Sequence, residues 1–423
     1  MPLSEQEQTS LTALDERELI ETLRQLLRIP SITGQEAAAQ QWLAQQMQAI
    51  GLDVDLWSMD VAEMQRHPHF PGMEVERNQH EALGLVGIWS HAQHTEGKRL
   101  IFNGHIDVVP AGDEANWQHQ PWSADLDNGR LYGRGACDMK GGLMAALYAI
   151  KAIKDAGIPI HGSLMLQSVI GEEDGGLGTF ATLLRGYTGD AAIVCEPTNL
   201  NLIPSQAGAL TFTVHVRGKS AHACVRLEGV SAIEKYLDIH HILLQLEQKR
   251  NRDVGHPLLG KLALPYPLSI GRMQAGNWSS SVPEELVFEG RIGVAIGESS
   301  TAVRQQFEHT LANLAATDTW LRDHPPEVQW TGGQFDSGEI ALDHPLIQLC
   351  RQSVYDLTQR EPQLEGAPYG SDLRLFVNQG HIPALLFGPG DVRLAHMPDE
   401  WVSIDEVVQA ARAYVLVALR FLA

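Results

Sequence analysis

The sequence predicts an α/β protein with a mostly parallel, doubly wound sheet in a large domain and a smaller α+β domain inserted into it. The chain has 423 residues, which is more than one ordinary domain needs. In its first and last parts, short apolar runs typical of buried strands alternate with helix-like stretches, a pattern typical of parallel sheets covered by helices. The middle of the chain has strands with alternating apolar and polar residues, which is typical of a sheet with one covered face.

The first part of the chain, residues 1–206, carries most elements of the parallel sheet. Helical periodicity runs over about 15–50 and breaks near Pro30, because proline disrupts helix hydrogen bonding. A hairpin is expected over 123–132, with Asn128-Gly129 as its turn. Buried strands are expected over 99–103, 164–170 and 191–195, and a helix over 141–155.

Residues 207–328 form the predicted inserted domain. Leu210–Arg217 and Leu286–Ile292 alternate with period two, and helical stretches are expected over 230–248 and 302–315. From about residue 329 the first pattern returns. A helix is expected over 345–357, a strand over 383–387 and a last helix from about Ser403.

Composition narrows the classes of partner. Lys and Arg number 31 and Asp and Glu 52, a net charge of −21 at pH 7, which argues against nucleic acid and anionic membranes as partners. The four cysteines form no CxxC pair, so no disulfide framework is expected. The first residues lack the apolar core of a signal peptide, and no run approaches about 18 apolar residues. We therefore expect a cytoplasmic protein that binds neither nucleic acid nor membrane.

Histidine and carboxylate side chains follow several predicted strands or precede the helix at 141–155. They are His105, Asp107, Asp138, Glu172, Glu173 and Glu196. Taken singly, each has a simpler interpretation: a structural histidine, a helix N-cap, a solvated loop or a turn. Because ligands of an open α/β sheet bind beyond the carboxyl ends of its strands, four segments with such residues at one edge favour a metal site. Imidazole and carboxylate suit zinc, and also cobalt or manganese.

Five motifs occur in the order GHIDVVP, GRGACDMKGG, GEEDGG, CEPTN and AHMPDE. With them the chain resembles the family of dinuclear zinc metallopeptidases that includes acetylornithine deacetylase, succinyl-diaminopimelate desuccinylase, aminoacylase and glutamate carboxypeptidases. The resemblance covers nearly the whole chain. It implies a catalytic domain made of 1–206 and 329–423, with 207–328 as an inserted dimerisation or lid domain.

The resemblance implies two divalent ions per chain. Zinc is the first choice of metal, and cobalt and manganese are alternatives. The ligands it implies are His105 and Glu196 for one ion, Glu173 and His396 for the other, and Asp138 between the two. Asp107 is implied to orient His105, as carboxylates commonly do for a ligating imidazole. The peptide bond after Asp138 is implied to be cis.

Other residues acquire roles in catalysis and substrate binding. Neighbouring side chains in an extended turn diverge, so Glu173 is assigned to the metal and Glu172 to the proton, as general base. His222, in RGKSAHA, is implied to cross to the active site of the partner in a homodimer and to donate to the oxyanion. Asn277 and Arg374 lie in segments that the resemblance implies to contact substrate.

The function expected is hydrolysis of the amide bond of a small N-acyl amino acid, as by acetylornithine deacetylase, with water activated between two metal ions. Two alternatives remain within this class: a dipeptidase or carboxypeptidase, and a deformylase of an N-formyl heterocyclic amine. An inactive binding protein on the same fold is an alternative of another class. The segment 60–77, an insertion that contains His67 and His69, has no role in this scheme.

Overall fold

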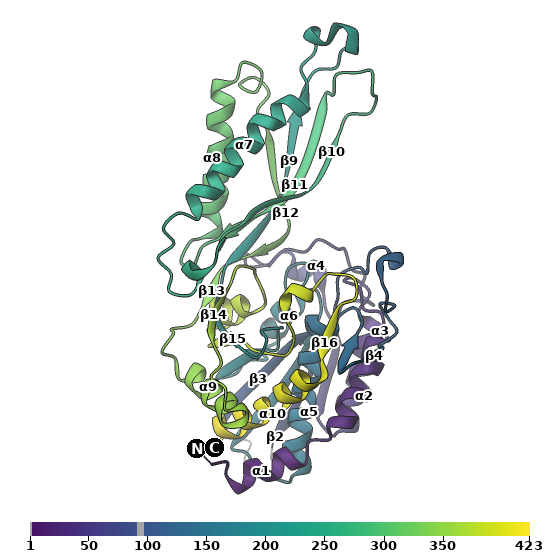
Figure 1. The fold of residues 1–423 in the computed structure, drawn as a ribbon, viewed down its shortest axis with the longest axis vertical. Coiled ribbons are helices and arrows are strands. Elements are labelled where there is room, and N and C mark those ends of the chain that lie inside the picture. Colours follow the sequence, from purple (N-terminus) through teal and green to yellow (C-terminus); the bar gives the residue numbers. More distant parts are fainter. Residues whose placement is uncertain (1, 91–96) are drawn as a thin grey trace. The chain divides into compact units, whose positions relative to one another are not determined.

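The computed structural model describes residues 2–90 and 97–423, which form two compact units (Figure 1). Unit 1 comprises the residues up to Pro204, Glu339–Glu365 and Ser371–Ala423. Unit 2 comprises Ser205–Gly338 and Gly366–Gly370. The predicted insertion, 207–328, therefore falls inside unit 2.

The large sheet has the strand order β1-β2-β6-β3-β7-β15-β8-β13, and β14 pairs with β8. Its centre is parallel, because β3 pairs in parallel with β6 and β7, and β7 with β15. Antiparallel pairs occur toward the edges, and the mostly parallel sheet is confirmed. The strands are β1 (Asp53–Ser58), β2 (Leu83–Ser90), β3 (Lys98–His105), β6 (Gly162–Val169), β7 (Ala191–Val194), β8 (Leu202–Gln206), β13 (Gly338–Glu339), β14 (Leu364–Ala367) and β15 (Ala384–Leu386).

Helices cover this sheet as expected for a doubly wound fold. Helices α5 and α10 lie side by side and contact β3, whereas α3 and α6 contact β2 (Figure 1). The predicted break near Pro30 separates α2 from α3. The helices are α1 (Glu5–Thr12), α2 (Glu16–Leu27), α3 (Ala37–Ala49), α4 (Val61–Met64), α5 (Gly141–Asp155), α6 (Leu177–Leu184), α9 (Pro345–Thr358) and α10 (Ile404–Phe421).

The predicted hairpin is formed by β4 (Leu126–Asp127) and β5 (Arg130–Tyr132), and β16 (Trp401–Ser403) pairs with β5. Asn128 and Gly129 have φ values of 48° and 75°. Two successive positive φ values are what a type I′ turn requires, and asparagine and glycine adopt them at low cost. This small sheet brings the end of the chain next to the segment that leads into α5.

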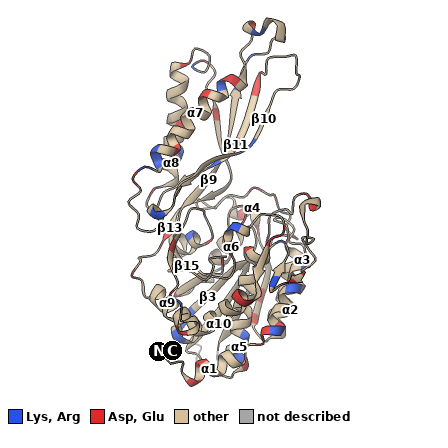
Figure 2. Cartoon of the chain, viewed as in Figure 1, with Lys and Arg blue, Asp and Glu red and all other residues tan. Residues whose placement is uncertain are grey.

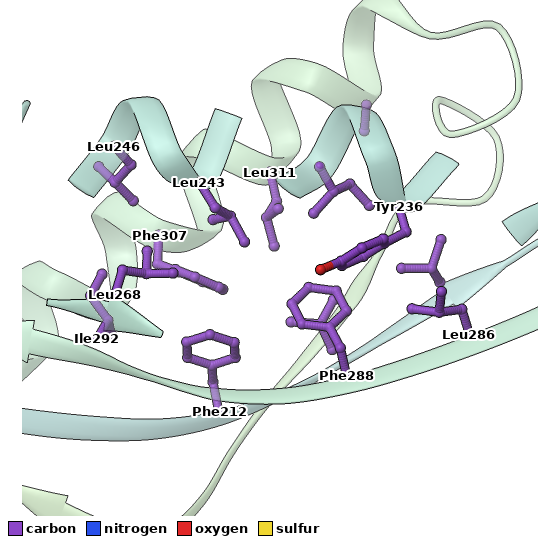
Figure 3. Close-up of a cluster of buried hydrophobic side chains, with 14 of the residues drawn as sticks. Phe212, Tyr236, Leu243, Leu246, Leu268, Leu286, Phe288, Ile292, Phe307 and Leu311 are labelled. Carbon is purple, nitrogen blue, oxygen red and sulfur yellow. The ribbon is translucent and has the colours of Figure 1, made fainter. Parts of the chain in front are cut away.

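Unit 2 contains an antiparallel sheet of order β10-β11-β9-β12 and two helices. The elements are β9 (Gly208–Arg217), α7 (Ala232–Arg250), β10 (Leu268–Ala275), β11 (Glu285–Val294), α8 (Ser300–Thr317) and β12 (Glu327–Phe335). Every second residue of β9 is buried, as the period of two predicts. Figure 3 shows Phe212 and Phe288 of the sheet packed beneath Tyr236 and Leu243 of α7 and Phe307 of α8. Unit 2 thus has a hydrophobic core of its own.

Acidic and basic residues are interspersed along the helices, as on α2 and α7 (Figure 2). Arg24 and Glu21 of α2, for example, form an ion pair of 2.9 Å. Within the part of the chain that the structure describes, no helix combines the length and the apolar character needed to cross a membrane. The four cysteines are free, and three of them are buried.

Candidate metal centre

The candidate metal centre of unit 1 lies where the parallel strands end. The register of the sheet pairs His105 of β3 with Val169 of β6, so these two strands end side by side. Glu172 and Glu173 lie in the loop after β6, and Glu196 follows β7. Asp138 belongs to a short turn, Ala136–Lys140, directly before α5. The structure therefore brings together the segments that the sequence placed at one edge, with His396 joining from the loop before β16.

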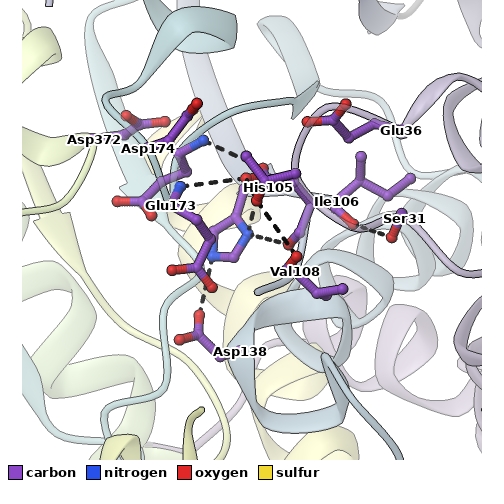
Figure 4. A network of polar contacts seen from close by, with 12 residues as sticks. Ser31, Glu36, His105, Ile106, Val108, Asp138, Glu173, Asp174 and Asp372 are labelled. Carbon is purple, nitrogen blue, oxygen red and sulfur yellow. Dashed lines mark hydrogen bonds and ion pairs between the residues drawn. The ribbon is translucent and has the colours of Figure 1, made fainter. Parts of the chain in front are cut away.

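Asp138 lies between two imidazoles. One of its oxygens, Oδ1, is 3.0 Å from Nε2 of His105 (Figure 4), and the other, Oδ2, is 3.5 Å from Nε2 of His396. The same His396 nitrogen is 3.1 Å from the carboxylate of Glu173, and Nε2 of His105 is 3.9 Å from that of Glu196. The peptide bond between Asp138 and Met139 is cis. A carboxylate placed in this way has one oxygen available to each of two neighbouring cations.

His105 is oriented by Asp107, but through the backbone. Its Nδ1 donates to the carbonyl oxygen of Asp107 at 2.8 Å, whereas the Asp107 carboxylate is 3.7 Å away. This hydrogen bond places the ring proton on Nδ1 and turns Nε2 toward the acidic cluster. The Asp107 carboxylate instead accepts the backbone N–H groups of Glu172 and Glu173, at 3.2 and 3.3 Å. It therefore fixes the loop that carries both glutamates.

The two adjacent glutamates belong to different groups of possible ligands. Glu173 forms one group with His105 and Asp138, and Glu172 another with His105 and Glu196; within each group the donor atoms lie within 4.8 Å of one another. His105 is common to both groups, and neither group contains both glutamates. Glu172 and Glu196 are buried, with exposed fractions of 7% and 5%.

Burial and neighbouring charges shift the pKa values of the side chains in this cluster. Burial and the charge of Asp138 raise the pKa of Glu196 well above its usual range, and burial and the charge of Glu196 do the same for Glu172. Hydrogen bonds to Asp138 and Glu173 raise the pKa of His396 to about 10. Burial alone would lower the pKa of His105, but the hydrogen bond to Asp138 and the nearby carboxylates raise it well above its usual value.

The carboxyl groups retain protons because like charges are crowded together away from water, whereas the imidazoles retain protons because negatively charged carboxylates lie beside them. Divalent cations remove this repulsion, since they bind the deprotonated form of each ligand. The donor atoms are imidazole nitrogen and carboxylate oxygen, a combination that suits zinc and related ions. The residues present therefore fit a centre for divalent metal ions.

A buried ion pair supports the segment that holds Asp138. Arg134 Nη1 donates to Glu400 Oε2 at 2.7 Å, and the other oxygen of Glu400 accepts the backbone N–H groups of Cys137 and Asp138 at 2.9 and 3.0 Å. Sequence reasoning did not assign a role to Glu400 or Arg134. Both lie inside motifs that were singled out, AHMPDE and GRGACDMKGG, so their charge within a motif was the signal available.

Three further residues were assigned by the resemblance: His222, Asn277 and Arg374. His222 and Asn277 belong to unit 2 and are exposed. Asn277 follows β10 and lines a hollow of about 310 Å³ in that unit. Arg374 is in unit 1 but only 2% exposed, and its guanidinium donates to the carbonyl oxygens of Ser371 and Gly175, both at 2.7 Å. This geometry favours a role for Arg374 in holding the loop of Gly175 over contact with a substrate carboxylate.

Comparison with known proteins gives the family. Residues 101–420 match the family model described as peptidase family M20/M25/M40. The chain belongs to this family. Members of the M20 family are hydrolases of amide bonds and bind metal ions, and this chain is such a hydrolase.

Relatives within the M20 family differ in substrate. The chain is 31% identical to N-formyl-4-amino-5-aminomethyl-2-methylpyrimidine deformylase of Halalkalibacterium halodurans, over 88% of this chain and 86% of the relative. It is 28% identical to succinyl-diaminopimelate desuccinylase of Rhodospirillum centenum, over 95% and 96% of the two chains. The structure of a tripeptidase from Staphylococcus aureus superposes with a TM-score of 0.71 at 20% identity, covering 97% of this chain and 99% of that one. This last likeness shows the shared fold.

Proposed function

We propose that the protein is a dinuclear amidohydrolase that removes a small acyl group from an amine. Two divalent ions, zinc or in its place cobalt or manganese, would be held by His105, Glu196, Glu173 and His396, with Asp138 shared. The observation that carries this proposal is the position of Asp138, whose two oxygens face two different imidazoles at 3.0 and 3.5 Å. Lewis-acid activation of the carbonyl and of water is what such ions supply when bound.

The proton transfers are assigned to Glu172. It accepts a proton from the water that attacks the carbonyl and donates it to the leaving amine. Its burial supports this assignment, because burial raises the pKa of this carboxyl group and a carboxylate with a raised pKa is a better proton acceptor. The Asp107 carboxylate keeps Glu172 in place through the backbone N–H that it accepts.

His222 is proposed as the donor to the developing oxyanion, supplied by the partner in a homodimer. Its Nδ1 accepts the backbone N–H of Cys224 at 3.2 Å. The ring proton of a neutral imidazole is then on Nε2, which supports a role for this exposed nitrogen as a donor. An apolar face of α7 supports self-association, because Ile233, Leu237 and Leu244 are 43%, 59% and 39% exposed.

Two substrate classes lead the proposal, ahead of dipeptides. An N-acyl amino acid presents a carboxylate beside the amide, for which Arg374 was the expected partner; its buried guanidinium, bonded to two backbone carbonyls, does not support that contact. An N-formyl aminomethylpyrimidine has no carboxylate, and the relative that is 31% identical carries out this deformylation. We therefore place the N-formyl heterocyclic amine first and N-acyl amino acids second, with dipeptides third. We propose the cytoplasm as the location, since the four cysteines are free.

A hydrolysis screen tests the proposal. The purified protein is freed of metal, reloaded with zinc, cobalt or manganese, and supplied with N-formyl aminomethylpyrimidine, N-acetyl and N-succinyl amino acids, and dipeptides. Release of the free amine is measured. We expect the highest kcat/KM on the formyl compound. Preference for an acyl amino acid would reverse the order of the two candidates, and binding of two ions without hydrolysis of any compound would favour the inactive binding protein.

A further inference from the structure

The segment 60–77 lies between β1 and β2, and its last residue contacts Asp174 in the loop after β6. After the short helix α4 it has no regular structure until β2 begins. Its last residue, Arg77, nevertheless has a side chain with no exposed surface. A guanidinium is always charged, and burying it is costly unless it is paired. Its partners therefore indicate what the segment does.

Arg77 forms a two-bonded fork with Asp174. Its Nη1 donates to Oδ2 of Asp174 at 3.0 Å and its Nη2 to Oδ1 at 3.1 Å. Nη2 also donates to Glu36 at 3.0 Å, and Nη1 to the carbonyl oxygen of Val75 at 3.1 Å. The side chains of Asp174 and Glu36 are 4% and 0% exposed. Such a fork fixes both the position and the plane of the carboxylate that it holds.

Asp174 directly follows Glu172 and Glu173 in the same loop. Its Oδ2 also accepts the backbone N–H groups of Glu74 and Val75, at 3.2 and 2.9 Å. The next residue, Gly175, has φ +147°, and a Cβ there would lie 2.3 Å from the carbonyl oxygen of Gly72. The segment 60–77 therefore lies directly against the loop, and only glycine permits so close an approach.

The loop is thus held from two sides. The Asp107 carboxylate accepts the N–H groups of Glu172 and Glu173, while Arg77 holds the next residue by its side chain. Arg77 also places a positive charge beside a region crowded with buried carboxylates. A lysine would keep this charge but could not reproduce the planar fork.

We propose that Arg77 is a positioning residue that sets the place of the Glu173 carboxylate, and with it the affinity for one of the two metal ions. This rests on the proposed function, in which Glu173 ligates one ion and Glu196 the other. Residues that orient metal ligands change affinity by about 10–100-fold when they are altered. The segment 60–77 thereby acquires a role in holding the metal centre.

The test compares Arg77→Lys with a matched variant, Arg185→Lys. Arg185 forms the same kind of fork with Asp55, at 2.7 and 3.2 Å, but on the surface of unit 1. Metal-free protein is titrated with Co²⁺, and binding is followed by visible absorption at a temperature where each variant is folded. We expect Arg77→Lys to bind one ion about 10–100-fold more weakly and the other as the wild type does. Arg185→Lys should bind both ions as the wild type does.

Two ions bound by Arg77→Lys with wild-type affinities would overturn the proposal, as would equal weakening by Arg185→Lys. If Arg77→Lys does not fold, Asp174→Asn decides, because it keeps the size of the side chain but loses the charged fork; wild-type affinities in that variant also overturn it. The wild-type titration tests the proposed function separately. If the wild type binds a single ion, the dinuclear function fails, and the Arg77 proposal is decided by whether Arg77→Lys weakens that ion.

Discussion

Arg134 and Glu400 form an ion pair of 2.7 Å in the interior of unit 1, with side chains that are 2% and 1% exposed. Removing one partner would leave the other charged and buried. We expect Arg134→Met to lower the free energy of unfolding by about 3–5 kcal/mol, measured by chemical denaturation of the metal-free protein. The control is Arg412→Met, because Arg412 pairs with Glu16 at 3.2 Å while both side chains are nearly half exposed. A surface pair of this kind contributes at most about 1 kcal/mol, so similar losses in the two variants would contradict the prediction.

The division of roles between Glu172 and Glu173 predicts different defects in two isosteric variants. Glu172→Gln keeps the size of the side chain but cannot accept a proton, so we expect it to retain both metal ions and to lose about 10²–10⁴ in kcat. Glu173→Gln should instead weaken the binding of one ion. Metal analysis after dialysis, together with kcat, separates the two. Loss of an ion by Glu172→Gln but not by Glu173→Gln would reverse the assignment.

A shared active site predicts complementation between two inactive variants. His222→Ala should lower kcat by about 10²–10³, the usual cost of losing an oxyanion donor, without loss of metal. Mixing it with Glu172→Ala should restore part of the activity, because one heterodimer site then contains both intact residues. Light scattering checks that the protein is a dimer, and differently tagged subunits check that exchange has occurred. Exchange without recovery of activity would argue against a histidine supplied by the partner.

The carboxylate of Glu7, which is outside the metal centre, should make the stability of the folded protein depend on pH. Burial raises its pKa, but hydrogen bonds from Arg420, at 2.6 Å, and from the backbone N–H of Ser4, at 2.7 Å, outweigh this and hold the pKa below its usual 4.5. A carboxylate with a lowered pKa in the folded state stabilises above its unfolded pKa, and this contribution is lost as the pH falls through the folded value.

We therefore expect Glu7→Gln to be less stable than the wild type at pH 7 by about 1.5 kcal/mol, and the difference to shrink progressively below about pH 4.5. Thermal unfolding between pH 3 and pH 7 measures it. Glu5→Gln, an exposed position in the first turn of the same helix, is the control and should follow the wild type throughout. A difference that stays constant with pH would show that charge is not the cause.

Much of the architecture follows from local patterns. Apolar runs gave β3, β6 and β7, and the Asn128-Gly129 turn gave the hairpin, because both depend on residues adjacent in the sequence. The strands β2 and β10 were not predicted. In β2, LGLVGIWS, glycines interrupt the apolar run, and β10, LSIGRMQA, is mostly exposed. These strands form because paired neighbours supply hydrogen bonds, which a single segment does not reveal.

The residues of the candidate site also differ in how far the sequence could predict them. Residues that follow strands could be gathered at one edge from topology alone, whereas His396 lies in a loop and came only from the resemblance. Neither the strand topology nor the family resemblance pointed to Arg77. Its fork with Asp174 joins residues 97 positions apart in the chain, and nothing in the local sequence around Arg77 distinguishes it from a surface arginine.

The order of segments in the large sheet constrains when the protein can fold during synthesis. Unit 2 is almost entirely one continuous stretch with its own core, so it can close soon after it leaves the ribosome. The sheet of unit 1 cannot, because β7 at Ala191–Val194 pairs with β15 at Ala384–Leu386. Until β15 has been synthesised, the edge of β7 that it will occupy stays unpaired. A nascent chain with such an open apolar edge is prone to associate with other chains. Chaperones that bind such chains would therefore act on the half-finished unit 1 while unit 2 is already native.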